Sequence, residues 1–303
     1  MEKIIYQADA FTEVLYGGNP AAVVLDARGL NEEEMLKIAK EMNLSETAFV
    51  FPSDNDTTEY TLRFFTTTGE VDLCGHATIA SFFLLGTKGL IQGNNNVKVV
   101  RQKTKAGILP VELFFNNNRV ERVLMTQRKP EFVSKIKEKD ILAEIMGMSI
   151  KDIGIENFDV VPEIVSTGLK DIMLPVKSLK ALKSISPNNQ KLKEHCENLD
   201  VIGVHAFTLE TEEKDSTVSC RNFAPLVGID EESATGTSNG AMGAYLVKNN
   251  ILKYENDITI VSEQGHYMGR PSKIIIKIEG PKENCIVKVG GAAVITIEGK
   301  IIL

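Results

Sequence analysis

The stretch that decides the fold is Thr66–Ala80, TTTGEVDLCGHATIA, in which an acid, a thiol and an imidazole come just before a long apolar segment. These groups belong to Asp72, Cys74 and His76. The apolar segment predicts a helix that is enclosed on every side. Because the first N–H groups of a helix have no partner within it, a helix beginning at Gly75 can bind an anion such as a carboxylate.

A second stretch with the same plan lies further along the chain. The segment Arg63–Thr78 (RFF…CGHAT) resembles Arg221–Asn239 (RNF…TGTSN), and Cys74 and Thr235 lie 161 positions apart. In each copy an Arg-x-Phe strand precedes an acidic loop, a glycine and a helix rich in small residues. Solenoid repeats have periods of about 20–50 residues, so this spacing predicts a duplicated domain. We expect two similar halves whose helix starts face one interdomain cleft.

Composition excludes several classes of function. The 303-residue chain has a net charge of −7 and a pI near 5.3, so it lacks the basic excess expected of a nucleic-acid-binding protein. No run approaches the roughly 18 apolar residues of a membrane helix. The cysteines form no C-x-x-C pair, which predicts neither a metal site nor a disulfide framework and favours the cytoplasm. They are Cys74, Cys196, Cys220 and Cys285.

Hydrophobic periodicity gives the coarse order of elements. It predicts helices over Asn31–Glu41 and Ile79–Leu85, and surface helices within the lysine-rich segment Lys135–Asn189. Strands are expected at Lys3–Ala8, Ala21–Leu25, Thr47–Phe51, Tyr60–Phe65, Val201–Leu209 and Thr217–Phe223. We expect an N-terminal domain of residues 1–118 with a returning strand at about 290–303, and a C-terminal domain of residues 119–289.

Four separated motifs resemble the phenazine-biosynthesis PhzF-like family. They are DAFTEVLYGGNPAAVV, NLSETAFVF, FFTTTGEVDLCGHATIA and FAPLVGIDEESATGTSNGA. The resemblance implies an α+β, diaminopimelate epimerase-like fold with two similar domains, each a mixed β-sheet or barrel rolled around a central helix. It also implies a homodimeric isomerase that needs no cofactor and moves a proton on a small anionic, carboxylate-bearing substrate in the interdomain cleft.

By the same resemblance, Glu46 in the string SETAFV is the acid and base that moves the proton. Asn43 and Glu46 also have the spacing of a helix capping box, but TAFVFP is typical of a strand, so capping explains the glutamate poorly. The apolar residues that follow Glu46 predict partial desolvation, which would raise its pKa.

The resemblance makes His76 an assisting catalytic residue. A helix start favours a neutral imidazole, although a histidine packed under the loop is the alternative. Asp72 is expected to orient the substrate or to cap the helix. Cys74 matches the Cys-Gly-His/Asn motif of racemases that use two thiolates, yet the equivalent position holds Thr235. A hydroxyl is not an adequate base near neutral pH, so racemisation by two thiols is disfavoured. Cys74 is then a buried apolar residue, with a cysteine-dependent epimerase as the alternative.

The second copy departs from the usual family string Asp-Pro-Ala-Thr-Gly-Ser. Here it reads ESATGT, so Glu232 and Thr237 replace the aspartate and the serine. We expect Glu232 to assist catalysis, unless it is a solvated loop acid. The expected substrate-binding residues are Asn19, Asp72, Gly75, Thr235, Gly236 and Thr237. Two alternatives stay open: a cysteine-dependent epimerase or racemase, and a ligand- or partner-binding relative that has lost the chemistry.

Overall fold

A computed structural model describes residues 2–53 and 58–303, and the chain divides into two compact units. The first unit comprises Met1–Thr126 and Gly290–Leu303, and the second comprises Gln127–Val289. The division falls after strand β8 (Arg119–Thr126) rather than before it, because β8 pairs along its length with β7 (Gly107–Asn116). The sequence places this boundary at residue 118, one strand too early.

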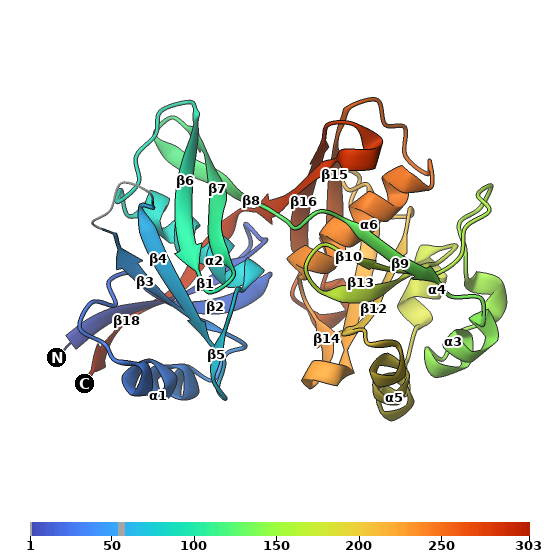
Figure 1. The fold of residues 1–303 in the computed structure, drawn as a ribbon, viewed down its shortest axis with the longest axis horizontal. Coiled ribbons are helices and arrows are strands. Elements are labelled where there is room, and N and C mark those ends of the chain that lie inside the picture. The colour runs from blue at the N-terminus through green and yellow to red at the C-terminus, as the bar shows by residue number, and fades with distance from the viewer. Residues whose placement is uncertain (1, 54–57) are drawn as a thin grey trace. The chain divides into compact units, whose positions relative to one another are not determined.

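The first unit is a mixed sheet that surrounds one helix (Figure 1). Its neighbouring strands follow the order β18-β1-β2-β3-β4-β6-β7-β8, with β2–β3 and β4–β6 parallel and the other pairs antiparallel. The short strand β5 pairs with β4. The remaining elements are β1 (Glu2–Ala10), β2 (Asn19–Val24), α1 (Glu32–Met42), β3 (Thr47–Pro52), β4 (Tyr60–Phe65), β5 (Glu70–Val71), α2 (Gly75–Thr87), β6 (Val97–Thr104) and β18 (Ala293–Ile302).

The second unit repeats this pairing pattern. Its order is β9-β10-β11-β12-β13-β15-β16, with β11–β12 and β13–β15 parallel and β14 paired with β13. Its strands are β9 (Glu131–Lys135), β10 (Glu163–Ser166), β11 (Lys170–Pro175), β12 (Gly203–Thr208), β13 (Val218–Ala224), β14 (Ile229–Glu232), β15 (Asp257–Gln264) and β16 (Ser272–Glu279), and β17 (Ile286–Gly291) leads back to the first unit. Its helices are α3 (Lys139–Ile145), α4 (Leu179–Ser184), α5 (Asn189–Leu199) and α6 (Gly236–Lys248).

Each unit is organised around one 13-residue helix, α2 or α6. Both helices are buried from their second or third residue almost to their end, as the run of apolar and small residues predicts. Helix α2 packs on strands of the first sheet, and α6 (orange in Figure 1) packs on β10, β11, β12 and β16. The glycines of α6 permit this close approach, since a Cβ at Gly243 would lie 2.8 Å from Ile276.

The peripheral helices pack on the outer faces of the sheets. Helix α1 begins at a capping box in which Asn31 and Glu34 bond each other's backbone, and it ends at Asn43 in the left-handed conformation. In the second unit α3, α4 and α5 cover an apolar core. Within the described residues, no helix combines the length and the apolar character needed to cross a membrane.

The lysine-rich segment is where the sequence prediction is incomplete. Besides the surface helices it contains β10 and β11, short strands buried on both faces, whose burial removes the alternation by which an exposed strand is recognised. Helix α5 was also missed, because only Leu192 and Cys196 of its residues are buried. Two buried residues make too narrow an apolar stripe for a reliable helical pattern.

Candidate active site

The start of α2 carries two of the predicted groups. Cys74 is the N-cap residue in an extended conformation, and its side chain makes no capping hydrogen bond. Gly75 and His76 are the first two helical residues. The Cys74 Sγ lies 3.5 Å from Nδ1 of His76 and 3.9 Å from Nε2, so the thiol contacts the imidazole ring.

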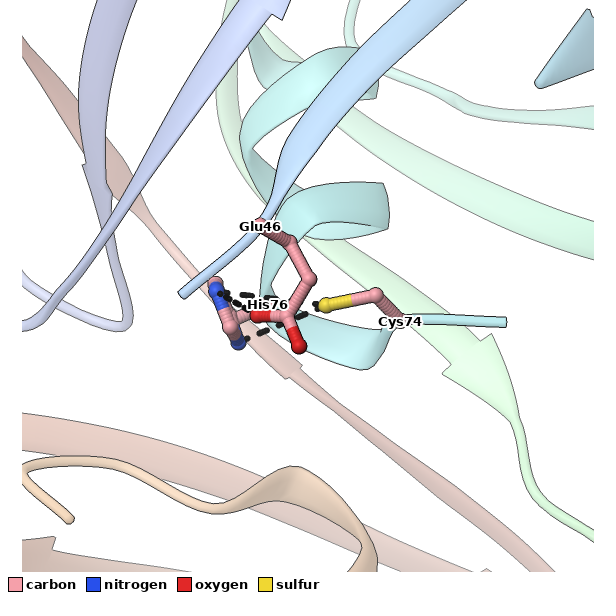
Figure 2. Close-up of side chains that lie close together, drawn as sticks. All are labelled: Glu46, Cys74 and His76. Atoms are coloured by element: carbon pink, nitrogen blue, oxygen red, sulfur yellow. Dashed lines mark hydrogen bonds and ion pairs between the residues drawn. The ribbon is translucent and has the colours of Figure 1, made fainter. Parts of the chain in front are cut away.

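Glu46 reaches the same place from the start of β3. Its carbonyl oxygen accepts a hydrogen bond from the Ala22 N–H, which fixes its backbone beside β2. Its Oε2 lies 3.2 Å from Nε2 of His76. Figure 2 shows the carboxylate between the imidazole and the thiol of Cys74. The Glu46 side chain is 20% exposed, against 8% for His76, although its Oε2 beside the ring is itself buried.

Asn19 contacts the opposite nitrogen of the ring. Its Nδ2 lies 3.4 Å from Nδ1 of His76, and Asn19 itself is buried at the first position of β2. The turn before it needs a glycine, because Gly18 has a φ of 59° and a Cβ there would lie 2.2 Å from the Ala10 carbonyl oxygen. The Gly-Gly-Asn-Pro string is therefore both a turn and the support of a site residue.

The charges within the cluster differ from those predicted. Burial favours a raised pKa at Glu46, but the hydrogen bond and the charge of His76 outweigh it, so the pKa lies below its usual 4.5. Burial likewise favours a lowered pKa at His76, but Cys74 and Glu46 raise it well above 6.5. The expectations of a raised pKa for Glu46 and a neutral His76 are both wrong, because each group stabilises the charge of the other.

The thiol of Cys74 stays protonated near neutral pH and is therefore the least available of the three groups as a base. Burial raises the pKa of Cys74, and the negative charge of Glu46 raises it further. The same three residues could each offer one ligand atom to a metal ion, since these atoms all lie within 4.8 Å of one another. The sequence did not predict this donor set, because Glu46 is separated from the other two by a strand pair.

Asp72 lies outside the cluster. Its side chain is exposed, and the N-cap position of α2 belongs to Cys74, so the capping role considered for Asp72 is wrong. The carbonyl oxygen of Asp72 accepts a hydrogen bond from the Ala106 N–H, which ties the loop to the turn between β6 and β7.

The start of α6 holds a second polar cluster. Thr235 is its N-cap residue, and the Oγ1 donates to Oε2 of Glu232 at 2.6 Å. Gln264 Nε2 donates to the Glu232 carbonyl oxygen at 2.7 Å and to Thr235 Oγ1 at 3.2 Å. Its Oε1 accepts from Nδ2 of Asn239 at 2.8 Å. Sequence analysis missed Gln264 and Asn239, although a glutamine directly before a glycine turn was a usable signal.

The two predicted residues that follow Thr235 form the first turn of α6. Gly236 and Thr237 are both partly exposed, and the Thr237 carbonyl oxygen accepts a hydrogen bond from Thr167 Oγ1 at 2.8 Å. Their backbone N–H groups have no side-chain cap from Thr235, whose hydroxyl is directed to Glu232. The structure therefore assembles Glu232, Thr235, Gly236 and Thr237 around one helix start.

A family model described as phenazine biosynthesis-like protein (PhzC-PhzF) matches residues 8–299. The chain belongs to this family. A protein from Clostridium acetobutylicum named as an uncharacterized isomerase is 38% identical over 99% of this chain and 98% of its own length. The trans-2,3-dihydro-3-hydroxyanthranilate isomerase of Pseudomonas fluorescens is 29% identical over 97% and 98%, respectively. The chain is accordingly an isomerase.

Solved structures confirm the predicted fold class. A PhzF-family phenazine biosynthesis protein of Bacillus anthracis superposes with a TM-score of 0.89 at 29% identity, covering all of both chains. A hydroxyproline epimerase from Agrobacterium vitis has a TM-score of 0.63 at 12% identity, with 99% of this chain and 92% of that chain covered. The latter likeness concerns the fold alone, an epimerase-like arrangement that also hosts racemases.

Proposed function

We propose that this isomerase moves a proton between two carbon atoms of a small carboxylated molecule and that Glu46 is its acid and base. The observation that supports this most directly is the cluster at the start of α2, where the Glu46 carboxylate lies 3.2 Å from the His76 ring and the Glu46 side chain is 20% exposed. The lowered pKa of Glu46 keeps it ionised near neutral pH, in the form that can accept a proton.

The reaction balances without any other reactant. Glu46 takes a proton from one carbon of the substrate, and electron density moves toward a conjugated oxygen or carbon. The protonated His76, whose pKa is raised, lies beside Glu46 and stabilises the developing negative charge of the substrate through its own positive charge. Glu46 then returns the proton to another carbon. No cofactor takes part in this scheme.

We assign the start of α6 to substrate binding. The uncapped N–H groups at Gly236 and Thr237 fit a carboxylate, and the Thr237 hydroxyl fits a polar substituent. Glu232 is fixed by Thr235 and assists proton transfer in this proposal. In the first unit, Asn19, Gly75 and the exposed Asp72 are assigned to substrate contacts.

The family supports the substrate class that we propose. The Pseudomonas fluorescens relative is named for a molecule with a carboxylate, an amino group and a hydroxyl group on a ring. Because Glu232 and Thr237 replace smaller residues of the usual family string, we propose a substrate with the same carboxylate but different substituents. We also propose that the protein is a cytoplasmic homodimer. Light scattering of the purified protein tests whether it is a dimer.

The decisive experiment follows hydrogen–deuterium exchange at substrate carbon in D₂O. Small carboxylates, including trans-2,3-dihydro-3-hydroxyanthranilate, are incubated with the wild type and with Glu46→Gln. We expect the variant to lose about 10²–10⁴-fold in exchange rate, the usual contribution of a positioned acid or base. Glu41→Gln is the matched control, because Glu41 is exposed on α1 and should leave the rate unchanged.

Cys74 separates the proposal from the racemase alternative. Cys74→Ser keeps a hydrogen-bonding group beside Glu46 and His76, so we expect it to retain most of the exchange. A racemase that uses the thiol would show the reverse pattern, with exchange lost in Cys74→Ser and kept in Glu46→Gln. Exchange that survives Glu46→Gln unchanged would remove Glu46 from the mechanism, and absence of exchange with every carboxylate would favour the binding-protein alternative.

A further inference from the structure

A buried acid lies behind the start of α6 and has no part in the chemistry above. Asp171 on β11 is 2% exposed, and its Oδ2 accepts a hydrogen bond of 2.5 Å from the Oγ of Ser238. Ser238 is the third residue of α6, is 1% exposed and directly follows Thr237. A strand of the second sheet is thereby bonded to the first turn of the helix through two side chains.

Strand register identifies the equivalent positions in the first unit. Thr47 of β3 pairs with Phe65 of β4, two residues after Arg63. In the second unit Val204 of β12 pairs with Phe223 of β13, two residues after Arg221. Thr47 and Val204 are therefore equivalent.

The next strand pair extends the comparison. Ala22 of β2 pairs with Thr47, and Ile172 of β11 pairs with Val204, both in parallel register. Ala22 and Ile172 are therefore equivalent, and the residues before them are Ala21 and Asp171. Ala21 is fully buried, as Asp171 nearly is.

The helix side of the contact is compared through the N-caps. Ala77 stands three residues after Cys74, and Ser238 stands three residues after Thr235. Where the second unit has the acid and the hydroxyl, the first unit thus has Ala21 and Ala77, both at 0% exposure. The duplicated fold forms without this polar pair, and a buried carboxylate costs desolvation energy. Formation of the fold therefore does not require the pair.

The surroundings of the pair point to the first turn of α6. Thr167, in the turn between β10 and β11, donates to the Thr237 carbonyl oxygen at 2.8 Å. The β10–β11 hairpin therefore holds two successive helix residues, Thr237 through its backbone and Ser238 through its hydroxyl. Burial, with a smaller contribution from the charge of Glu232, raises the pKa of Asp171 to about 6 against the opposing effect of hydrogen bonds from Ser238 and the Gly203 backbone.

We propose that Asp171 and Ser238 are a positioning pair that fixes the first turn of α6, and with it Thr237, in the geometry that binds the substrate. The inference rests on the substrate contact assigned above to Thr237. Neither residue of the pair touches substrate, since both are buried. The negative charge of an acid near a helix N-terminus also interacts favourably with the helix dipole.

The test places the alanines of the first unit at the equivalent positions of the second unit. The double variant Asp171→Ala/Ser238→Ala removes both members of the pair, so neither stays buried without the other. It copies Ala21 and Ala77 of the first unit, so we expect it to fold. Asp171→Asn keeps a hydrogen-bond acceptor for Ser238 and serves as the conservative variant. Ser81→Ala is the matched control, because Ser81 is a fully buried serine of α2 that bonds only its own helix at the Ala77 carbonyl oxygen.

Two measurements are made on each variant. Amide hydrogen exchange of the peptide that contains the start of α6 is followed by mass spectrometry, and KM and kcat are measured with trans-2,3-dihydro-3-hydroxyanthranilate or the best exchanging carboxylate of the panel. For the double variant we expect amide exchange at least about tenfold faster, from the loss of a hydrogen bond to a charged group. KM should rise about as much while kcat falls less. Asp171→Asn should restore most of both properties.

The outcomes separate this inference from the proposed function. Wild-type amide exchange in the double variant overturns the inference, and so does faster amide exchange with an unchanged KM, because the pair would then serve only the fold. A wild type that turns over none of the probes refutes the proposed function instead. Amide exchange then decides by itself whether the pair holds the helix start.

Discussion

The starts of α2 and α6 share a frame and differ in the groups placed on it. Each follows a strand whose arginine makes two parallel bonds to a glutamate, Arg63 to Glu70 at 2.7 and 2.6 Å and Arg221 to Glu231 at 2.9 and 2.8 Å. Each arginine also stacks on the ring of the phenylalanine two residues later. The N-cap of each helix is extended and is followed by glycine.

The carboxylates that face the two N-caps come from different strands. Glu46 precedes β3 in the first unit, whereas Glu232 ends β14 in the second. Register makes Val71 the equivalent of Glu232, since Val71 pairs with Phe64 and Glu232 with Asn222. The duplication thus preserved the backbone and moved the acid. This arrangement differs from symmetric two-thiol chemistry, which would place the same base at both helix starts.

The two helix starts differ most at His76, whose equivalent in α6 is Thr237. His76→Gln removes the cation that pairs with Glu46, and we expect carbon exchange in D₂O to fall about 10²–10⁴-fold. Thr237→Ser keeps the hydroxyl and should lose far less. His195→Gln, on the outer helix α5, is the control and should match the wild type. Equal losses in His76→Gln and Thr237→Ser would show that the two helix starts contribute alike.

The next largest effect concerns the two arginines and is measured by urea unfolding. Arg221 is 10% exposed and also donates to the carbonyl oxygens of Leu182 and Ile185, so Arg221→Ala should cost about 3–5 kcal/mol. Arg63 is 27% exposed, and solvent screens its ion pairs, so Arg63→Ala should cost about 1 kcal/mol. Equal destabilisation would mean that the carbonyl contacts of Arg221 contribute nothing.

The fold could be predicted because the repeated frame is visible in the sequence itself. Arginine, glycine and the small-residue helix recur in the same order, and the enclosed helix containing Ile79–Leu85 follows from an unbroken apolar run. The strands β10 and β11 left no such signal, since burial on both faces removes alternation. Local sequence patterns therefore identified the repeated arginine, glycine and helix better than they identified the buried strands β10 and β11.

The site could be predicted only as far as residue types and motifs extend. Glu46 and His76 were named as partners in one reaction, and the structure places them in contact. Their charges were mispredicted because each pKa depends on the other group, which a sequence does not place in space. Asp171 could not be found for a related reason. Asp171 stands out only because the equivalent residue of the first unit is Ala21, and this equivalence is known from the strand register.

A smaller effect is expected at the N-caps themselves. Thr235→Val removes the hydrogen bond of 2.6 Å to Glu232, and the loss of such a bond to a charged group costs about 1.5–3 kcal/mol in unfolding free energy. Thr235→Ser retains the hydroxyl and should be near the wild type. In the first unit Cys74→Ala should cost less, because a thiol is a weak donor. A larger cost for Cys74→Ala than for Thr235→Val would reverse this ranking of the two caps.

The smallest expected effect is the pH dependence that distinguishes the two helix starts. The pKa of Glu46 is lowered below 4.5, so its contribution to stability is present above that value and is lost as the pH falls through the lowered pKa. The pKa of His76 is raised above 6.5, so its contribution is present below 6.5 and is lost as the pH rises through the raised pKa. Both contributions are therefore complete between about pH 4.5 and 6.5.

The measurement is the difference in unfolding free energy between the wild type and His76→Gln across this range. It should be largest between about pH 4.5 and 6.5 and should decline on both sides. Thr237→Val is the matched control, since it replaces the equivalent residue of α6 with one that also cannot titrate, and its difference from the wild type should change little with pH. A pH-independent difference for His76→Gln would mean that Glu46 and His76 are not an ion pair. The start of α2 would then resemble the start of α6 in having no ion pair at these equivalent positions.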